Sequence, residues 1–353
     1  MLSLFFYQPT KTTLISHLVK ANGDNNWQHA LILNDINGAY GSVGYPETLR
    51  RSLKEIIQNW DISLVVSPGD VVAGQKSSLD NSQVRAMWQG FYQQILLPFE
   101  HANIPFALSL GNHDGSKSSR PSVINGSQSS KVINYTYQLE RSETEAFWLS
   151  HSPELNFINQ EKFPYFYHFE FAGGRFVMLD LSGHQILEEE WLLIESMLQH
   201  DTTNGPLFVV GHLPLSGVAV SRNKFGEVIQ ASDKLMALFN KYNVDVYISG
   251  HQHAFYPAKY QELFLLNAGG MPARQFVGNQ HQVQAQVQAM AESETITTVN
   301  KPTVSVLSVN AKNGGFYTTT YEIETLQIVD ETLLPDFING FPYTIHRAKI
   351  ESH

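Results

Sequence analysis

Short apolar runs recur along the chain, and each is followed by glycine or a polar cluster and then by a segment of helical periodicity. LILN ends at Asn34, SLVVS at Ser67 and PFALSL at Leu110. Residues 46–60 lie between the first two runs and repeat apolar positions on one helical face, with Pro46 suited to a first turn. Alternating apolar strands and helices indicate a βαβ arrangement, with a sheet covered on both faces.

The middle of the chain continues this alternation. Residues 79–103 predict a second helix, broken near Pro98, and residues 187–199 predict an amphipathic helix with its acids near the N-terminus. Residues 165–181 predict two strands joined at two glycines, as in a β-hairpin. Three further strands are expected in PLFVVG, DVYISG and LFLLNAGG.

Polar composition interrupts the pattern in two places. Residues 115–131 are rich in serine and glycine and predict a surface loop, and residues 279–292 form a glutamine-rich helix candidate. The later runs VSVLSV and FYTTTYEIET predict antiparallel strands. We expect one domain over residues 1–353, with its motifs at about 30–270 and residues 300–353 completing a second sheet.

Acids, amides and imidazoles gather directly after five of the predicted strands. The loops beyond the carboxyl ends of the strands converge on one crevice in an open α/β sheet, so these side chains should meet. They are Asp35 and Asn37; Asp70; Asn112, His113 and Asp114; His212; and His251 and His253.

This set of side chains suits a pair of metal ions. Two ions need a carboxylate to bridge them, further oxygen and nitrogen ligands, and a water or hydroxide between them. Any one histidine here is more often structural than functional. The five segments taken together, in order and each after a strand, indicate a metal centre.

Composition limits the alternatives. The chain has no cysteine, so a metal must be bound by oxygen and imidazole. The net charge of −10 argues against a nonspecific grip on nucleic acid or on an anionic membrane, and no nucleic-acid partner is expected.

The ordered motifs GD, GNHD, GH and GHxH, after an opening acid, resemble the signature of the calcineurin-like metallophosphoesterases over about residues 30–270. The resemblance implies an α/β fold: a four-layer α/β/β/α sandwich of two mixed sheets flanked by helices. It also implies a centre of two divalent ions, which could be manganese, iron or zinc, and a small phosphate ester as substrate.

Roles follow from the matching positions. By resemblance, Asp35 and His253 bind the first ion, Asp70 bridges, and the second ion is bound by Asn112, His212 and His251. A hydroxide between the ions attacks phosphorus, His113 protonates the leaving group as general acid, and Asp114 orients His113. Two divalent ions against two carboxylates and one hydroxide leave a charge of roughly +1, so an acidic protein can bind a phosphate ester.

The sequence departs from the family at Asn37, where histidine is usual. An amide oxygen is a harder and weaker ligand than imidazole, so Asn37 would favour Mn²⁺, Mg²⁺ or Fe²⁺ over Zn²⁺ at the first site, or would only orient Asp35. Ala73 stands where the purple acid phosphatases have a tyrosine ligand, which argues against that subfamily.

Other candidates have a structural alternative. Tyr40 and Tyr45 either line a substrate pocket or pack in the core. His184 follows a strand ending in Asp180, which we expect to cap a turn. Residues 115–131 and 216–230 are lid candidates by length and polarity alone.

Two rivals remain beside the hydrolase of phosphoric monoesters or diesters. One is a catalytically weak or idle metal- or phosphate-binding protein, in which the first ion no longer binds because Asn37 replaces the usual histidine. The other is a nuclease of the same superfamily. The N-terminal sequence has no signal-peptide pattern, which weakly favours the cytoplasm, although an exported chain trimmed of its signal would look the same. No stretch is long enough for a transmembrane helix, and oligomeric state is open.

Overall fold

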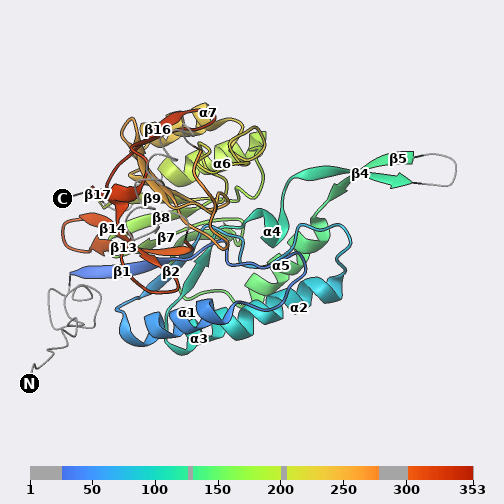
Figure 1. The fold of residues 1–353 in the computed structure, drawn as a ribbon, viewed down its shortest axis with the longest axis horizontal. Helices are drawn as coiled ribbons and strands as arrows, with labels where there is room; N and C mark the ends of the chain where they lie inside the picture. Colours follow the sequence, from blue (N-terminus) through green and yellow to red (C-terminus); the bar gives the residue numbers. More distant parts are fainter. Residues whose placement is uncertain (1–25, 126–129, 200–204, 278–300, 353) are drawn as a thin grey trace, which may run out of the picture.

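Two β-sheets lie face to face between helices in the computed structural model (Figure 1). The structure describes residues 26–125, 130–199, 205–277 and 301–352. For residues 120–135 it describes the backbone of the strands and no side chains. The glutamine-rich helix candidate at 279–292 and the apolar N-terminal residues lie outside the described residues. Among the described helices, none is long and apolar enough to cross a membrane.

The first sheet has six strands in the order β17-β14-β13-β1-β2-β3. Its strands are β1 (Trp27–Ile32), β2 (Leu64–Ser67), β3 (Phe106–Leu108), β13 (Thr303–Asn310), β14 (Phe316–Glu322) and β17 (Glu351–Ser352). Strands β1, β2 and β3 are parallel, whereas β13 pairs antiparallel with both β1 and β14. The sheet is therefore mixed, and the antiparallel pairing of β13 and β14 is confirmed.

The second sheet has nine strands in the order β15-β16-β11-β12-β10-β9-β8-β7-β6. They are β6 (Asn156–Lys162), β7 (Phe166–Phe171), β8 (Gly174–Met178), β9 (Leu207–Val210), β10 (Val246–Ser249), β11 (Tyr256–Tyr260), β12 (Leu263–Asn267), β15 (Phe337–Asn339) and β16 (Thr344–Arg347). Strands β8, β9, β10 and β12 are parallel, and the predicted β7–β8 hairpin is present.

Helices cover the outer faces of both sheets (Figure 1). Those beside the first sheet are α1 (Glu47–Asn59), α2 (Asn81–Phe91), the π-helical turn η1 (Tyr92–Leu96), α3 (Leu97–His101) and α5 (Gln138–Ser150). Those beside the second are α6 (Glu188–Gln199) and α7 (Ser232–Lys241). The described residues also contain the short elements α4 (Asn112–Gly115) and η3 (Glu331–Leu333). The predicted four-layer sandwich is confirmed, and η1 interrupts the second helix just before Pro98.

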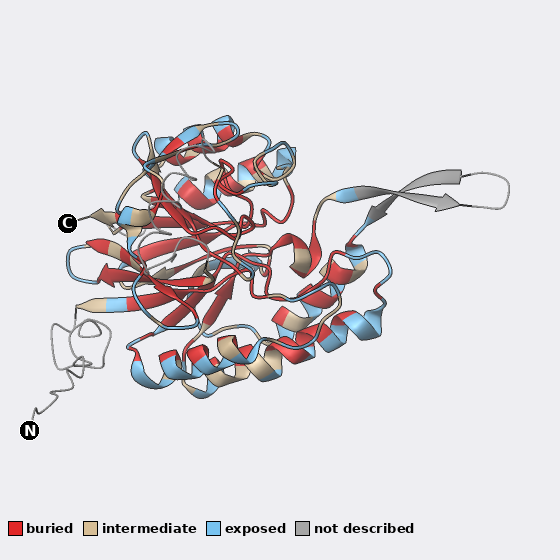
Figure 2. Cartoon of the chain, in the orientation of Figure 1, coloured by how far each residue is buried: buried red, intermediate tan, exposed pale blue. Residues whose placement is uncertain are grey.

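Alternating side chains of the first sheet enter two different cores. Ala30 and Ile32 of β1 face the second sheet, whereas Leu31 packs with Leu49 and Leu53 of α1. A strand buried on both faces reads as a continuous apolar run, which is why residues 30–33 carry no polar position. Figure 2 shows the result, with buried sheets inside helices whose outer faces are exposed. This rigid frame holds the strand ends from which the polar side chains project.

Two expectations about connecting and terminal segments need revision. Residues 115–131 do not form a simple loop, because β4 (Ser119–Asn125) and β5 (Ser130–Thr136) pair as a hairpin that projects from the body (Figure 1). Polar composition hid these strands, since serine carries no period-two hydrophobic signal. The strands of residues 300–353 were expected to complete the second sheet, but they divide between the two sheets. Strands β13, β14 and β17 belong to the first sheet, and β15 and β16 belong to the second.

Candidate metal centre

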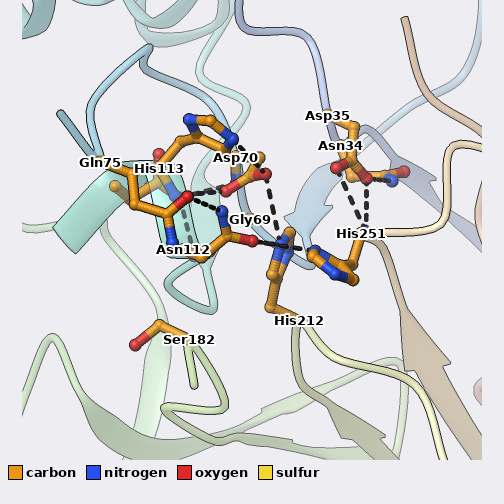
Figure 3. A network of polar contacts seen from close by, with 12 residues as sticks. Asn34, Asp35, Gly69, Asp70, Gln75, Asn112, His113, Ser182, His212 and His251 are labelled. Carbon is orange, nitrogen blue, oxygen red and sulfur yellow. Dashed lines mark hydrogen bonds and ion pairs between the residues drawn. The ribbon is translucent and has the colours of Figure 1, made fainter. Parts of the chain in front are cut away.

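The polar segments predicted after five strands meet where the carboxyl ends of the two sheets face each other. The loops after β1, β2 and β3 of the first sheet and after β9 and β10 of the second supply them. Figure 3 shows Asp70 between His113 and His212, with Asn112 directed toward His212 and His251. Side chains as far apart in the sequence as Asp35 and His253 are thus neighbours in space.

Four of these residues have backbone torsions that side chains rarely adopt. The residues with positive φ include Asp35 (48°), Asp70 (57°), His251 (66°) and His253 (53°). Left-handed backbone costs a residue with a β-carbon about 1–3 kcal/mol and persists where surrounding structure enforces it, commonly at functional sites. The strain therefore coincides with the predicted ligands.

Asp70 lies at the centre of the cluster. Its Oδ2 is 3.3 Å from His212 Nε2, and its Oδ1 accepts a hydrogen bond from the backbone N–H of His113 at 2.7 Å. A β-carbon on Gly111 would lie 2.2 Å from Asp70 Oδ1, so glycine is required for this approach. Among the described residues, two groups could hold a metal ion, and Asp70 belongs to both: one with His212 and His251, the other with Asp35 and His253.

In each imidazole of these groups, one ring nitrogen contacts an oxygen outside the groups. This contact orients the ring so that the other nitrogen faces the cluster. His212 Nδ1 lies 2.8 Å from the Pro68 carbonyl oxygen, and His253 Nδ1 lies 3.1 Å from that of Pro272. A carbonyl oxygen only accepts, so both Nδ1 atoms donate and both Nε2 atoms face the carboxylates. His253 Nε2 is 3.2 Å from Asp35 Oδ1. Metal-binding histidines are held by the same kind of contact.

His251 is oriented the other way round. Its Nε2 lies 2.8 Å from Glu227 Oε2, so Nε2 donates to the carboxylate and Nδ1 is left as the lone-pair atom. That Nδ1 lies 2.9 Å from Asn112 Oδ1. Burial, more than any other factor, lowers the pKa of His251 to about 4, while Glu227 acts in the opposite direction. The ring is therefore neutral at neutral pH, as a metal ligand must be.

Asn112 turns its oxygen toward the histidines because its nitrogen is occupied. Asn112 Nδ2 donates to Gln75 Oε1 at 2.9 Å, and Asn112 Oδ1 lies 2.9 Å from both His212 Nε2 and His251 Nδ1. Three potential ligand atoms thus converge on one buried place. Such a convergence of lone pairs needs a proton or a cation. Here the proton on His212 and Arg222 Nη1, 2.9 Å from His251 Nδ1, fill that role, and the donor set also fits a metal ion in their place.

The ionisation of the acids fits the same conclusion. Burial acts to raise the pKa of Asp70 and of Asp35, but the nearby His212 and His113 around Asp70, and His253 beside Asp35, hold both pKa values below their usual range. Both carboxylates are therefore charged and able to bind a cation at neutral pH. Burial acts to lower the pKa of His212, yet Asp70 raises it to about 9, so a bound metal ion would displace a proton there.

His113 lies at the edge of the cluster, facing the cleft. Its Nδ1 donates to the Gly74 carbonyl oxygen at 3.0 Å, and its Nε2 is 3.9 Å from Asp70 Oδ2. The expected role of Asp114 in orienting this ring needs correction, because the Asp114 carboxylate accepts backbone N–H groups instead. Those donors are Asp70, Val71, Val72 and Gly111, at 2.7–3.0 Å. Asp114 thereby fixes the two loops that carry Asp70 and Asn112.

The aromatic candidates differ from each other. Tyr40 is 51% exposed, lines the cleft, and has its ring centroid 5.2 Å from that of His113. Tyr45 does not line the cleft: its hydroxyl donates to the Val71 carbonyl oxygen at 2.5 Å and its ring packs against the core beneath the first sheet. The packing alternative therefore holds for Tyr45. Asn37 lines a second cavity, together with His253 and Tyr40.

Several residues of the cleft escaped the sequence analysis. A cavity of about 490 Å³ lies over the cluster, and its lining includes Gln75, His184, Arg222, Lys224, Glu227 and Arg274. The lid candidate at 216–230 forms one wall, with Val220 N–H bonded to the Gln275 carbonyl oxygen at 2.9 Å. Asp180 caps a turn as expected, accepting from Ser182 N–H at 3.2 Å. No motif marked these residues, and a search for cations in loops after strands would have found the arginines.

Comparison with known families agrees with the fold. Residues 29–255 match the family model Metallophos, the calcineurin-like phosphoesterases. The match covers more than half of the chain, so this protein belongs to the calcineurin-like phosphoesterase family. No curated protein matches the sequence.

Comparison with solved structures finds matches at low sequence identity. GAP50, described as the anchor in the inner membrane complex of Plasmodium, is 16% identical with a TM-score of 0.50, over 93% of this chain and 90% of that one. A putative 5′-nucleotidase from Staphylococcus aureus is 10% identical with a TM-score of 0.41, over 80% and 51%. Zinc-bound Vps29 from Entamoeba histolytica is 8% identical with a TM-score of 0.34, over 86% and 96%.

Proposed function

We propose that this chain is a metal-dependent hydrolase of phosphoric esters with a dinuclear centre. The observation that carries the proposal is the position of Asp70, which is shared by two groups of Asp and His residues able to hold a metal ion. A carboxylate shared by two such groups is what a bridging ligand requires. Membership of the calcineurin-like family supports the same reaction class.

The proposed ligands divide between the two ions. Asp35, Asn37 and His253 bind the first, whereas Asn112, His212 and His251 bind the second, and Asp70 bridges. The convergence of Asn112 Oδ1, His212 Nε2 and His251 Nδ1 supports the second set. The 3.2 Å approach of His253 Nε2 to Asp35 Oδ1 supports the first. Oxygen and imidazole donors suit manganese, iron or zinc.

When bound, two divalent ions supply a nucleophilic hydroxide near neutral pH and neutralise the charge of the phosphoryl oxygens. The chain's own residues supply orientation and a proton. His113 holds its Nδ1–H against the Gly74 carbonyl, so Nε2 is the atom that would give a proton to the leaving oxygen. Asp114 holds the loops of Asp70 and Asn112 in register through backbone hydrogen bonds.

A substrate panel tests the reaction class. The purified protein is stripped with chelator, reloaded separately with Mn²⁺, Fe²⁺ or Zn²⁺, and assayed with p-nitrophenyl phosphate and with the bis-p-nitrophenyl ester. We expect turnover of at least one ester with a loaded protein and none with the stripped one.

Two outcomes would favour the rivals. One bound ion per chain and no turnover with any metal would favour an idle metal-binding protein, with Asn37 as the cause. Cleavage of single- or double-stranded DNA with Mn²⁺, at rates above those for the small esters, would favour a nuclease. The acidic net charge of −10 speaks against this second outcome.

A further inference from the structure

Three cations line the cleft above the candidate metal centre of this acidic protein. Arg222, Lys224 and Arg274 all line the 490 Å³ cavity that also contains Asn112 and His251. The chain has only 23 basic residues against 33 acidic ones. The cleft therefore carries a local excess of positive charge although the net charge of the chain is negative. The electric field of such a cleft attracts anions.

Arg274 has bonding capacity left over inside the protein. Its Nε is buried and has no hydrogen-bond partner within the described ranges, while its Nη1 donates to Ser221 Oγ at 3.3 Å. Among the residues that the structure describes, no carboxylate lies within 4.0 Å of the Arg274 guanidinium. A buried N–H without an acceptor is destabilising, so the group favours an incoming anion.

Arg222 adds a second guanidinium nearby. Its Nη1 is 3.5 Å from Glu227 Oε2 and 2.9 Å from both ring nitrogens of His251. Glu227 is therefore shared between Arg222 and His251. One shared carboxylate does not neutralise Arg222, Lys224 and Arg274 together, and positive charge remains for a ligand.

The two arginines extend over both halves of the site. A second cavity of about 350 Å³ is lined by Asn37 and His253, and it shares Tyr40, Arg222 and Arg274 with the larger one. His113 also lines both cavities. The arginines therefore lie beside both proposed ion positions and beside the proposed proton donor. A ligand group next to the reacting phosphorus would fall within their reach.

We propose that Arg222, Lys224 and Arg274 bind a second phosphate of the substrate, and that the preferred substrates are monoesters of diphosphate. This inference rests on the proposed hydrolase function. A metal centre of charge roughly +1 suffices for one phosphoryl group, and the additional cations complement an additional one. Guanidinium groups match phosphate oxygens in charge and geometry.

The reaction balances as a hydrolysis. The oxygen of water forms a bond to the terminal phosphorus, and the bond from that phosphorus to the bridging oxygen breaks. The products are inorganic phosphate and the organic monophosphate. One proton of water stays with the released inorganic phosphate, and the other replaces the proton that His113 Nε2 gives to the leaving oxygen. Negative charge develops on the bridging oxygen as it leaves, and the arginines stabilise it on the inner phosphate.

Calorimetric binding of two probes to the Mn²⁺-loaded protein tests the subsite. Imidodiphosphate carries two phosphoryl groups and resists hydrolysis, whereas orthophosphate carries one. We expect Arg274→Gln to weaken imidodiphosphate binding about 10- to 100-fold, as loss of a charge-assisted contact predicts, and to weaken orthophosphate binding far less. Arg274→Lys should recover part of the loss, because it restores the charge. Lys54→Gln, an exposed lysine on α1, is the matched control and should change neither affinity.

Kinetics separate this inference from the function on which it rests. In the wild type we expect kcat/KM for a diphosphate monoester to exceed that for p-nitrophenyl phosphate, and Arg274→Gln to reduce that ratio about 10-fold or more. Hydrolysis of p-nitrophenyl phosphate with an unchanged ratio in Arg274→Gln would overturn the subsite and leave the hydrolase proposal intact. Arg274-dependent imidodiphosphate binding without hydrolysis of any ester would support the subsite and refute the hydrolase. Equal loss of both probes in Arg274→Gln would contradict the subsite directly.

Discussion

Gln75 accepts a hydrogen bond from Asn112, with Oε1 and Nδ2 2.9 Å apart, and this contact turns the Asn112 oxygen toward His212 and His251. An asparagine side chain binds a cation only through its oxygen, so its orientation decides whether it can be a ligand. Gln75 itself has a φ of 68°, the left-handed region that favours glycine. The backbone is thus strained at a residue whose side chain positions a proposed ligand.

We predict that Gln75→Gly weakens binding of the second ion about 10- to 100-fold, the usual effect of losing a residue that orients a ligand. Glycine suits this φ, so backbone strain does not oppose the change. Metal affinity is measured by competition with a chelator, and thermal unfolding of the stripped protein reports stability. Gln75→Glu keeps an acceptor oxygen and should bind the ion more tightly than Gln75→Gly. Equal affinities in the wild type and both variants would contradict this role.

The proton carried by His113 should matter most for poor leaving groups. We predict that His113→Asn lowers kcat for an alkyl phosphate about 10²- to 10⁴-fold, the range for loss of a general acid. The loss for p-nitrophenyl phosphate should be much smaller, because p-nitrophenolate departs without a proton. Steady-state kinetics over a series of leaving groups measures the difference, with His101→Asn on α3 as the control. A uniform loss across the series would assign His113 a structural role.

Asn37 stands at a position where the resemblance to the family predicts a histidine. We predict that Asn37→His retains activity and binds Zn²⁺ at the first site tighter on the order of 10-fold, because imidazole is a softer and stronger ligand than an amide oxygen. Asn37 lines the cavity of about 350 Å³ beside His253, so a longer imidazole has room there. Competition titration with a zinc indicator measures the change. Weaker zinc binding in the variant would show that Asn37 is not a ligand.

Much of this site could be predicted because its ligands follow strands in order along the chain. Asp35, Asp70 and His212 stand directly after apolar runs, and the rules of parallel sheets bring such positions together. Gln75 and Glu227 could not be found this way, since their contacts depend on the path of irregular loops. Asp114 shows a second limit: the motif indicated its importance, but only the structure shows that it accepts four backbone hydrogen bonds.

The fold was predictable where hydrophobic periodicity is strong. The helix at α1 and the buried strands β1 and β2 were evident, because apolar residues at regular spacing mark buried faces. The β4–β5 hairpin was missed because its serine-rich strands lack alternation. The division of the C-terminal strands between both sheets was also missed, since sheet membership depends on long-range pairing that local sequence does not specify.

Glu140 on α5 should make stability depend on pH. Its carboxylate accepts hydrogen bonds from the backbone N–H groups of Gln75 at 2.8 Å and Lys76 at 3.2 Å. Burial raises the pKa of Glu140 from 4.5 to about 7. Between these values the folded state binds more protons than the unfolded state, so the free energy of unfolding falls as pH rises.

We therefore predict that Glu140→Gln flattens the fall in unfolding free energy between about pH 4.5 and 7. Urea unfolding in the presence of EDTA measures the slope without a contribution from metal loss. Glu189→Gln, an exposed residue of α6, is the matched control and should keep the wild-type slope. The same slope in Glu140→Gln and the wild type would show that Glu140 titrates normally.

An Asp70 carboxylate shared between two ions would make the metal content of each chain depend on this one residue. The protein is equilibrated with Mn²⁺, freed of unbound metal by gel filtration, and analysed by plasma mass spectrometry beside Asp70→Asn and the exposed control Asp61→Asn. We predict two ions per chain in the wild type and the control, and at most one in Asp70→Asn, since an amide cannot supply a charged bridging oxygen. Two ions retained in Asp70→Asn, or fewer than two in the wild type, would show that Asp70 does not bridge two ions.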